Sequence, residues 1–180
     1  MIELIDSIYV AADTTSVSFG LGGDGVNNAE IDGDVDKHYE IIHHWAAPEV
    51  NDVKIQLVPN QLSTPITASQ YTYWLYANTA YNAAALVFAR SNWTIGGTVK
   101  PFSDGKLTLN SATGKNRMFT AEDCFGRGNL ESSLTLSQGE YSGVWADTAT
   151  KITSLGIVTT TALGIKIGSE FHLYKRSVAV

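Results

Sequence analysis

The most regular feature of the sequence is a short alternation of large apolar or aromatic residues with more polar ones. In the segment 39–45, one side carries Tyr39, Ile41, His43 and Trp45, and the residues between them form the other side. A period of two residues is typical of a β-strand with one buried face. The same alternation recurs in the segments 53–57, 71–76, 107–109, 134–136, 152–157 and 171–174.

Residues that favour turns separate these runs. Roughly eight to ten short strands at this spacing predict an all-β, single-domain β-sandwich, and a jelly roll is the arrangement we expect. The absence of a long helical pattern argues against a parallel sheet with crossover helices. The predicted turns are Pro59-Asn60, Gly96-Gly97, Ser103-Asp104-Gly105, Thr113-Gly114, Gly126 to Gly128 and Gly139.

Three segments need separate treatment. Residues 80–90 are rich in alanine and have some helical spacing, but the apolar run 86–88 suits a buried strand, which we predict. The segment Gly20 to Asp36 is rich in glycine, asparagine and acids, and predicts one exposed loop. Residues 1–15 are expected to form an N-terminal strand or arm that precedes a sandwich domain over 16–180. The apolar positions of this N-terminal segment suggest that it pairs with a neighbouring chain as an added strand; they are Ile2, Leu4, Ile8 and Val10.

Charge and composition narrow the possible partners. The 180 residues carry a formal net charge of −6, which gives no electrostatic reason to bind nucleic acid or an anionic membrane. No apolar stretch is long enough to span a bilayer, and the N-terminus lacks the features of a signal peptide. The single cysteine, Cys124, excludes an internal disulfide. We therefore expect a soluble protein made in a cytoplasm.

The acidic segment Glu30 to Asp36 places carboxylates at every second position, as calcium loops do. The EF-hand pattern fails, because Lys37 stands where that loop needs glycine and His43 where it needs a closing glutamate. We predict instead a turn in which aspartate side chains accept hydrogen bonds from nearby backbone N–H groups.

Histidines and the cysteine do not combine into a metal site. His43 and His44 are adjacent, so in a strand they point to opposite faces, and His38 and His172 lie elsewhere in the sequence. Zinc requires three or four converging ligands. Cys124 stands beside acids, which raise the pKa of a thiol, and we predict a small buried residue there rather than a nucleophile.

Signatures of catalysis are also missing. The sequence has no Gly-x-Ser-x-Gly motif, and the run Gly20 to Gly25 lacks the residues that make a phosphate-binding loop. We predict a non-enzymatic protein with no catalytic residue, no cofactor and no metal. The aromatic residues Tyr71, Tyr73, Trp74, Tyr76 and Tyr81 suggest contact with another subunit in preference to a sugar.

Three stretches carry a family resemblance. Ser16 to Gly20 followed by Asp32 to Glu40 resembles the opening "TSVSFSGLDGDTDxxYxL" of a loose group of tailed-phage virion proteins. Gly143 to Thr148, Ile152 to Leu155 and Ile167 to Tyr174 are similar to the closing pattern of that group. The segment from Gly105 to Arg117 resembles its middle. The chain departs from the group in the extra loop Gly22 to Glu30 and in the ending Lys175 to Val180.

The resemblance implies a component of the virion surface, and proteins of this kind are commonly jelly rolls arranged as trimers. We therefore expect a capsid decoration protein that is made in the host cytoplasm and binds the major capsid protein on the outer head surface, as a homotrimer. The alternative is a tail-fibre or spike module that binds host-surface glycans. A glycan hydrolase with a carboxylate pair comes last, because no pair stands out in the sequence.

Overall fold

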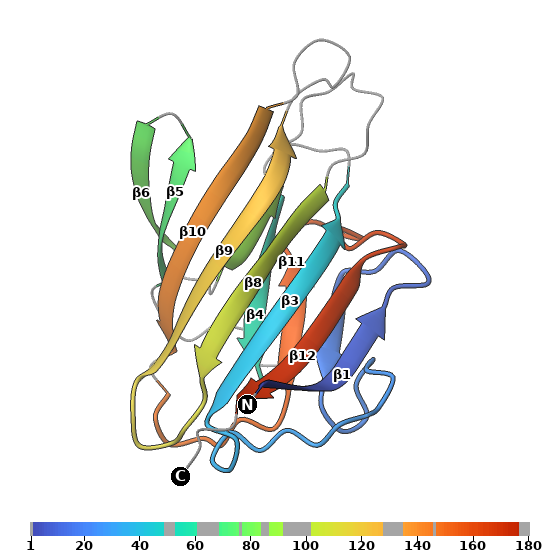
Figure 1. Ribbon diagram of the computed structural model, residues 1–180, viewed down its shortest axis with the longest axis vertical. Coiled ribbons are helices and arrows are strands. Elements are labelled where there is room, and N and C mark those ends of the chain that lie inside the picture. The colour runs from blue at the N-terminus through green and yellow to red at the C-terminus, as the bar shows by residue number, and fades with distance from the viewer. Residues whose placement is uncertain are drawn as a thin grey trace.

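The computed structural model describes residues 2–48, 53–60, 69–75, 77–83, 87–91, 102–127, 135–145 and 147–176. Throughout this part the chain forms strands and loops without a helix, so it contains no helix that could cross a membrane. The strands form two antiparallel sheets, which confirms the predicted all-β sandwich (Figure 1). The strands are β1 (Ile2–Tyr9), β2 (Ser16–Phe19), β3 (His38–Ala46), β4 (Val53–Pro59), β5 (Ser69–Leu75), β6 (Ala77–Ala83), β7 (Val87–Ser91), β8 (Phe102–Asn110), β9 (Arg117–Arg127), β10 (Thr135–Trp145), β11 (Leu155–Thr159) and β12 (Glu170–Arg176).

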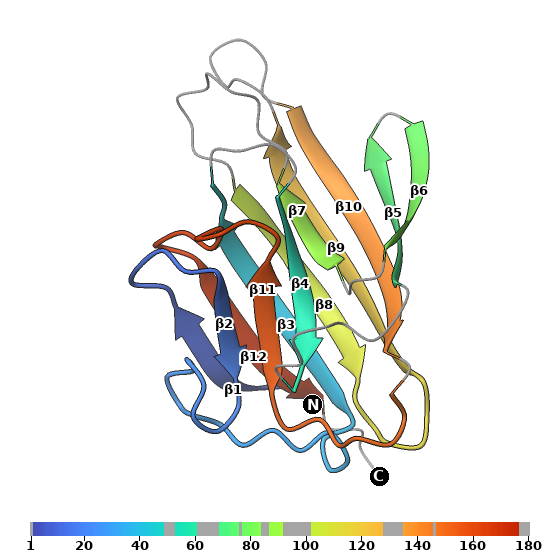
Figure 2. The same cartoon turned by 180° about the vertical axis from the view of Figure 1, so that it is seen from behind.

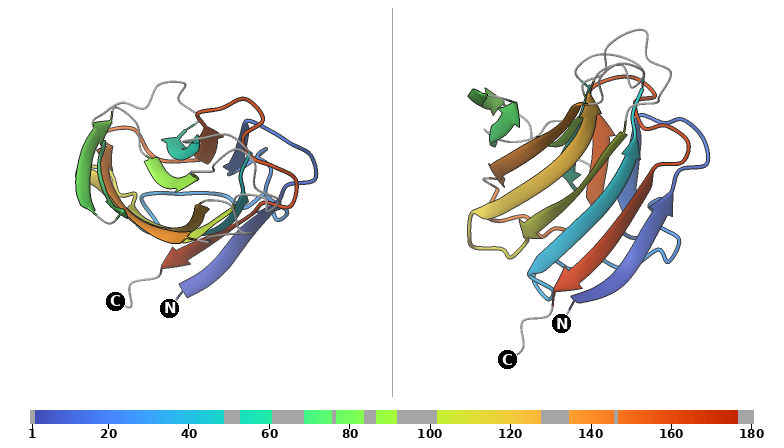
Figure 3. Two further views of the ribbon diagram at one scale, coloured as in Figure 1. Left: turned by 90° about the horizontal axis from the view of Figure 1, so that it is seen from above. Right: turned by 45° about the horizontal axis from the view of Figure 1, so that its top comes forward.

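The chain folds back on itself, so that early strands pair with late ones. β1 pairs with β12, β2 with β11, β3 with β8 and β4 with β7. The small sheet has the order β2-β11-β4-β7 (Figure 2), and the large sheet has the order β1-β12-β3-β8-β9-β10-β5-β6. The hairpins β5–β6 and β9–β10 thus extend the large sheet beyond β8. Seen from above, this extended sheet curves around the small one (Figure 3).

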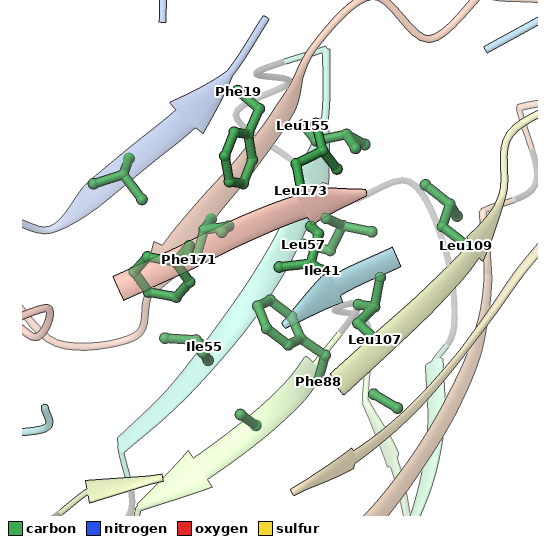
Figure 4. Packing of buried hydrophobic residues seen from close by; sticks show 14 of the residues in the cluster. Phe19, Ile41, Ile55, Leu57, Phe88, Leu107, Leu109, Leu155, Phe171 and Leu173 are labelled. Carbon is green, nitrogen blue, oxygen red and sulfur yellow. The ribbon is translucent and has the colours of Figure 1, made fainter. Parts of the chain in front are cut away.

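The core lies between the two sheets. Ile41 on β3 is directly opposite Leu107 on β8 and Leu173 on β12, and all three are fully buried. From the small sheet, Leu57 and Phe88 project toward them (Figure 4). The alternation predicted for 39–45 is confirmed, because Tyr39, Ile41, His43 and Trp45 are buried whereas Ile42 is 38% exposed.

Several glycines predicted to be in turns lie inside strands. Gly105 is in the middle of β8, Gly126 is in β9 and Gly139 is in the middle of β10. A side chain at Gly105 would collide with the backbone of β9 and would lie 2.8 Å from Cε1 of His43. A glycine that makes room for a close neighbour inside a strand looks like a turn glycine in the sequence. The predicted turns at Asn60 and Gly114 are confirmed, since both have positive φ angles, of 56° and 73°.

The segment-level predictions have mixed outcomes. Strand rather than helix is confirmed for the described parts of 80–90, which belong to β6 and β7. The segment from Gly20 to Asp36 is a loop, as predicted, because no strand occurs between β2 and β3. It is not exposed throughout, since Ile31 is buried in the core. The predicted turns Gly96-Gly97 and Gly128 lie outside the described residues, as does Tyr76.

Residues 1–15 contribute β1, which pairs with β12 of the same chain and forms the edge of the large sheet. Ile8 and Val10 are buried in the core, whereas Ile2 and Leu4 are half exposed. Pairing of this segment with a neighbouring chain stays a prediction, and the way in which its free edge is covered is described below.

Candidate interaction surface

The outward side chains of the large sheet form a continuous surface across its strands. Because side chains alternate along a strand, the register of the strands places outward residues in rows across the sheet. We call this surface the outer face. One row runs Tyr9, Glu170, His44, Asp104, Cys124, Gln138, and the next runs Ser7, His172, Ile42, Lys106, Glu122, Glu140.

The half of the outer face over β1, β12 and β3 carries apolar and imidazole groups. Leu4, Tyr9 and Ile42 are 49%, 58% and 38% exposed. The His172 ring lies edge-on to Tyr9 with the ring centres 5.8 Å apart, and its Nδ1 is 2.9 Å from Oγ of Ser7. Exposed apolar side chains beside polar hydrogen-bonding groups are typical of protein interfaces.

The other half, over β8, β9 and β10, is polar and slightly hollowed. A depression of about 430 Å³ is lined mainly by hydroxyl, carboxylate and ammonium groups. Glu122 lies directly opposite Glu140, and its Oε1 is 3.5 Å from Nζ of Lys106. Such groups can donate and accept hydrogen bonds to a sugar or to the polar rim of a protein partner. The lining residues are Lys106, Thr108, Thr120, Ala121, Glu122, Glu140, Tyr141 and Ser142.

The predicted separation of the two adjacent histidines is confirmed. His44 is exposed on the outer face, where its Nδ1 is 2.6 Å from Oδ1 of Asp104. His43 is buried on the opposite face of β3 and packs edge-on against Phe88. In the described part of the chain, no group of three or more histidine, cysteine or acidic side chains is placed to hold a metal ion.

A chain of buried polar side chains, which the sequence did not suggest, lies beneath the outer face. Nε2 of His43 is 3.3 Å from Oγ of Ser103, and Ser103 donates a hydrogen bond of 3.1 Å to Oδ2 of Asp123. All three residues are at most 3% exposed. Gly105 and Gly139 make room for them, since a side chain at either position would collide with this group or with the strand beside it.

These three residue types are those of a catalytic triad, but their hydrogen bonds run in the wrong direction. Since Ser103 gives its hydrogen to Asp123, the imidazole must donate to the serine oxygen and cannot take its proton. Burial lowers the pKa of His43 to about 3, so the ring is neutral, and its Nδ1 has no hydrogen-bond partner. The arrangement therefore supports the interior of the sandwich and does not activate a nucleophile.

The prediction that Cys124 is buried is wrong. Cys124 is exposed on the outer face because the inward positions of β9 are taken by its neighbours Asp123 and Phe125. The pKa of the thiol is raised, first by desolvation and then by the charges of Asp123 and Asp104. The thiol is therefore less reactive than an ordinary cysteine.

The acidic segment folds as the predicted turn. Oδ1 of Asp32 accepts hydrogen bonds from the backbone N–H groups of Asp34 and Val35, and Oδ2 of Asp32 accepts one from Lys151. The Lys151 hydrogen bond is the main cause that holds the pKa of Asp32 below its usual value. The hydrogen bond to Asp34 from the backbone of Thr113 has the same effect on the pKa of Asp34.

This turn belongs to a larger polar assembly at one end of the sandwich, which we call the basal cluster (residues 32–39, 111–117 and 145–152, without residue 146). The hydroxyl of Tyr39 donates to Asp36 over 2.7 Å and accepts from the N–H of Asp32 over 3.0 Å. The hydroxyl of Ser111 donates to the carbonyl of Gly33. Three stretches far apart in the sequence therefore hold one another in place.

Arg117 is the centre of the basal cluster and is fully buried. Its guanidinium donates to the carbonyls of Ala112 and Asp147, over 3.3 and 2.8 Å, and its Cζ lies 4.6 Å from the centre of the Trp145 ring. Burial lowers the pKa of Arg117. The arginine thus replaces its lost hydration with carbonyl oxygens and an aromatic face.

Comparison with known protein families and with curated proteins identifies no relative of this chain. No protein-family model matches the chain, and a search of curated proteins finds no match.

The side chains of the predicted aromatic group at Tyr71, Tyr73, Trp74 and Tyr81 lie outside the described residues, although the backbone of these residues forms β5 and β6.

Proposed function

We propose that this chain is a non-enzymatic structural protein of a tailed-phage virion, acting as a capsid decoration protein. The observation that carries the proposal is the basal cluster. Most of its residues come from the three stretches that resemble the phage virion group, and these residues contact one another although up to 119 positions separate them, as between Gly33 and Ile152. When stretches that resemble one group also contact one another in a fold, shared architecture is the expected cause.

The order of the strands supports a jelly roll with two inserted hairpins. A jelly roll has eight antiparallel strands in two sheets, and it results when the first strand pairs with the last, the second with the last but one, and so on inward. Removing β5–β6 and β9–β10 leaves eight strands that pair in this manner. The inserted hairpins enlarge one sheet and thereby its outer face.

In this proposal the outer face binds the major capsid protein, and the chain itself forms a homotrimer. A partner that binds only the assembled shell shifts the equilibrium toward the intact particle without any chemical step. A stable contact of this kind buries about 1,600 Å² in total, which requires a surface as broad as several strands. The protein would be made in the host cytoplasm and reside on the particle surface, with no nucleic-acid or membrane partner.

Binding to purified, expanded empty heads tests the proposal. The unmodified chain should bind the heads and raise the temperature at which they disrupt. Lys106→Glu, at the centre of the outer face, should weaken binding. Lys115→Glu makes the same change of charge in the turn between β8 and β9, away from the outer face, and should bind normally. If the unmodified chain does not bind the heads, the proposed role is contradicted. If the two variants bind equally well, the proposed surface is contradicted.

A glycan-binding module is the second candidate, and the polar depression on β8, β9 and β10 is the observation that favours it. Hydroxyl and carboxylate groups on a sheet face can hydrogen-bond several sugar hydroxyls at once. If the chain binds host cells or purified surface glycans and does not bind heads, this function is favoured over decoration. The Glu122→Gln variant should then lose the glycan binding.

A further inference from the structure

One side of the sandwich brings the ends of both sheets together. β1 is the last strand of the large sheet there, and β2 is the last strand of the small sheet (Figure 2). An edge strand presents unpaired N–H and C=O groups to which another strand can add. In this protein the segment Gly20 to Ala29, which we call the edge loop, runs along this side and contacts both strands.

The contact with β1 centres on Asp6, which is fully buried at a bulge in the pairing with β12. Its Oδ1 accepts hydrogen bonds of 2.8 Å from the N–H groups of Ser7 and Asn27, and its Oδ2 accepts one of 3.1 Å from Ala29. A buried carboxylate is stable only with such donors. Asp6 therefore fixes the edge loop to the strand beside it.

The edge loop also occupies carbonyl groups of β1. The N–H of Val26 donates to the carbonyl of Ser7 over 2.8 Å, and Nδ2 of Asn27 donates to the carbonyl of Ile5 over 3.1 Å. An incoming strand would need these two acceptors, which alternate along β1 as the free groups of an edge do. The middle of the β1 edge is thus already satisfied within the chain.

The edge of β2 is covered in the same manner. The N–H of Asp24 donates to the carbonyl of Ser18 over 2.7 Å, and the N–H of Ser18 donates to Oδ2 of Asp24 over 2.7 Å. One loop therefore covers part of the edge of each sheet on this side of the sandwich. The loop itself is a surface segment, in which Leu21 and Val26 are 68% and 67% exposed.

We propose that the edge loop is a guard against strand addition, and that a second copy of this chain would add to β1 if the loop were displaced. Next to the covered edge, Ile2 and Leu4 are about half exposed on the outer face. Antiparallel pairing of β1 with β1 of a second copy would bring these apolar side chains of the two copies together. The guard thus directs any native assembly to other surfaces.

Gly25→Ala is the variant that displaces the loop. The added carbon would overlap the Asp6 carboxylate, so the loop must move away from β1. Leu21→Ala is the control, because it lies in the same loop and its side chain is 68% exposed. A second variant, Asp6→Asn, replaces one acceptor oxygen by a donor that repels the loop N–H groups. Its control is Asp147→Asn, which weakens two backbone hydrogen bonds in the basal cluster.

Sedimentation velocity over a range of concentrations measures self-association. Amide hydrogen exchange at Val26, Asn27 and Ala29 shows whether the edge loop has moved away from β1. We expect Gly25→Ala and Asp6→Asn to exchange these amides faster and to self-associate at concentrations at least tenfold lower than the unmodified chain and both controls. Fast exchange without added self-association in either variant would overturn the proposal. Unchanged exchange in Gly25→Ala would equally overturn it, because the loop would then not rest on Asp6.

Discussion

The basal cluster and the outer face are both rich in charged residues, but they use their charges differently. In the basal cluster, Asp32 and Arg117 find their partners inside the same chain, and Arg117 is fully buried. On the outer face, Glu122 and Lys106 are 58% and 45% exposed at the side chain and stay in water. Charged groups with partners inside the chain hold a fold together, whereas solvated groups on a broad sheet remain able to bind a partner. The comparison assigns stability to one region and recognition to the other.

Among the substitutions that test this comparison, Arg117→Ala should lower the free energy of unfolding the most. The substitution leaves the carbonyls of Ala112 and Asp147 without their donor and opens a cavity beside Trp145. We expect the free energy of unfolding to fall by about 3–5 kcal/mol. Urea denaturation followed by tryptophan fluorescence measures it. A loss below about 1 kcal/mol would show that the basal cluster is not a stabilising unit.

Acid should destabilise the protein through His43. Burial lowers the pKa of His43 to about 3 in the folded chain, whereas the ordinary value is 6.5. Between these two pKa values the unfolded chain binds a proton that the folded chain does not. The free energy of unfolding should therefore be intact above pH 6.5 and fall below it, by up to about 1.4 kcal/mol per pH unit.

Denaturation curves between pH 4 and pH 7 measure this slope. His43→Gln should flatten it, because the amide can still donate to Ser103 but does not titrate. His44→Gln, on the outer face, is the matched control and should retain the slope of the unmodified chain. If the two variants have the same slope, the buried imidazole is not the cause.

Tyr39→Phe should have a smaller effect. It removes only a hydroxyl that joins Asp36 to the N–H of Asp32, while the ring stays in the core. We expect a loss of about 1–3 kcal/mol in the free energy of unfolding, because two polar groups lose a partner. Tyr9→Phe, at an exposed tyrosine of the outer face, should change the stability by less than about 0.5 kcal/mol. Equal losses would remove the distinction between the two regions.

Glu122→Gln should leave stability almost unchanged. The lost ion pair with Lys106 is exposed and contributes little, and the repulsion from Glu140 directly opposite is relieved at the same time. We expect a change within about 0.5 kcal/mol in either direction. The same variant should alter partner binding, which can be read from the head-binding or glycan-binding assay. A large loss of stability would mean that the outer face is part of the structural framework.

Calcium should have the smallest effect. The carboxylates of Asp32, Asp34 and Asp36 accept hydrogen bonds from protein N–H or O–H groups or from Lys151. A cation would have to displace these donors. The melting temperature should therefore be the same in EDTA and in millimolar calcium, as differential scanning calorimetry can show. A rise of many degrees with calcium would mean that the acidic turn at residues 32–36 is a metal site.

The strands were predictable where one face alone is buried, as in β3, because alternation records that condition directly. Gly105 and Gly139 misled the prediction, since the sequence does not record whether a glycine bends the chain or makes room for His43 and Asp123. The acidic turn was predictable from local spacing. Its attachment to Thr113 and the burial of Arg117 were not, because these contacts depend on how distant strands are paired.

The pairing of β1 with β12 has a consequence for the timing of folding. Ile2 lies opposite Arg176, so this edge of the large sheet cannot form until residue 176 has left the ribosome. Contacts between residues so far apart in sequence are slow to form. Ile8 is buried in the final structure, but during synthesis it stays exposed until its partner Phe171 has been made. A chaperone that shields short apolar segments should therefore raise the yield of folded protein more than a stabilising substitution in the basal cluster.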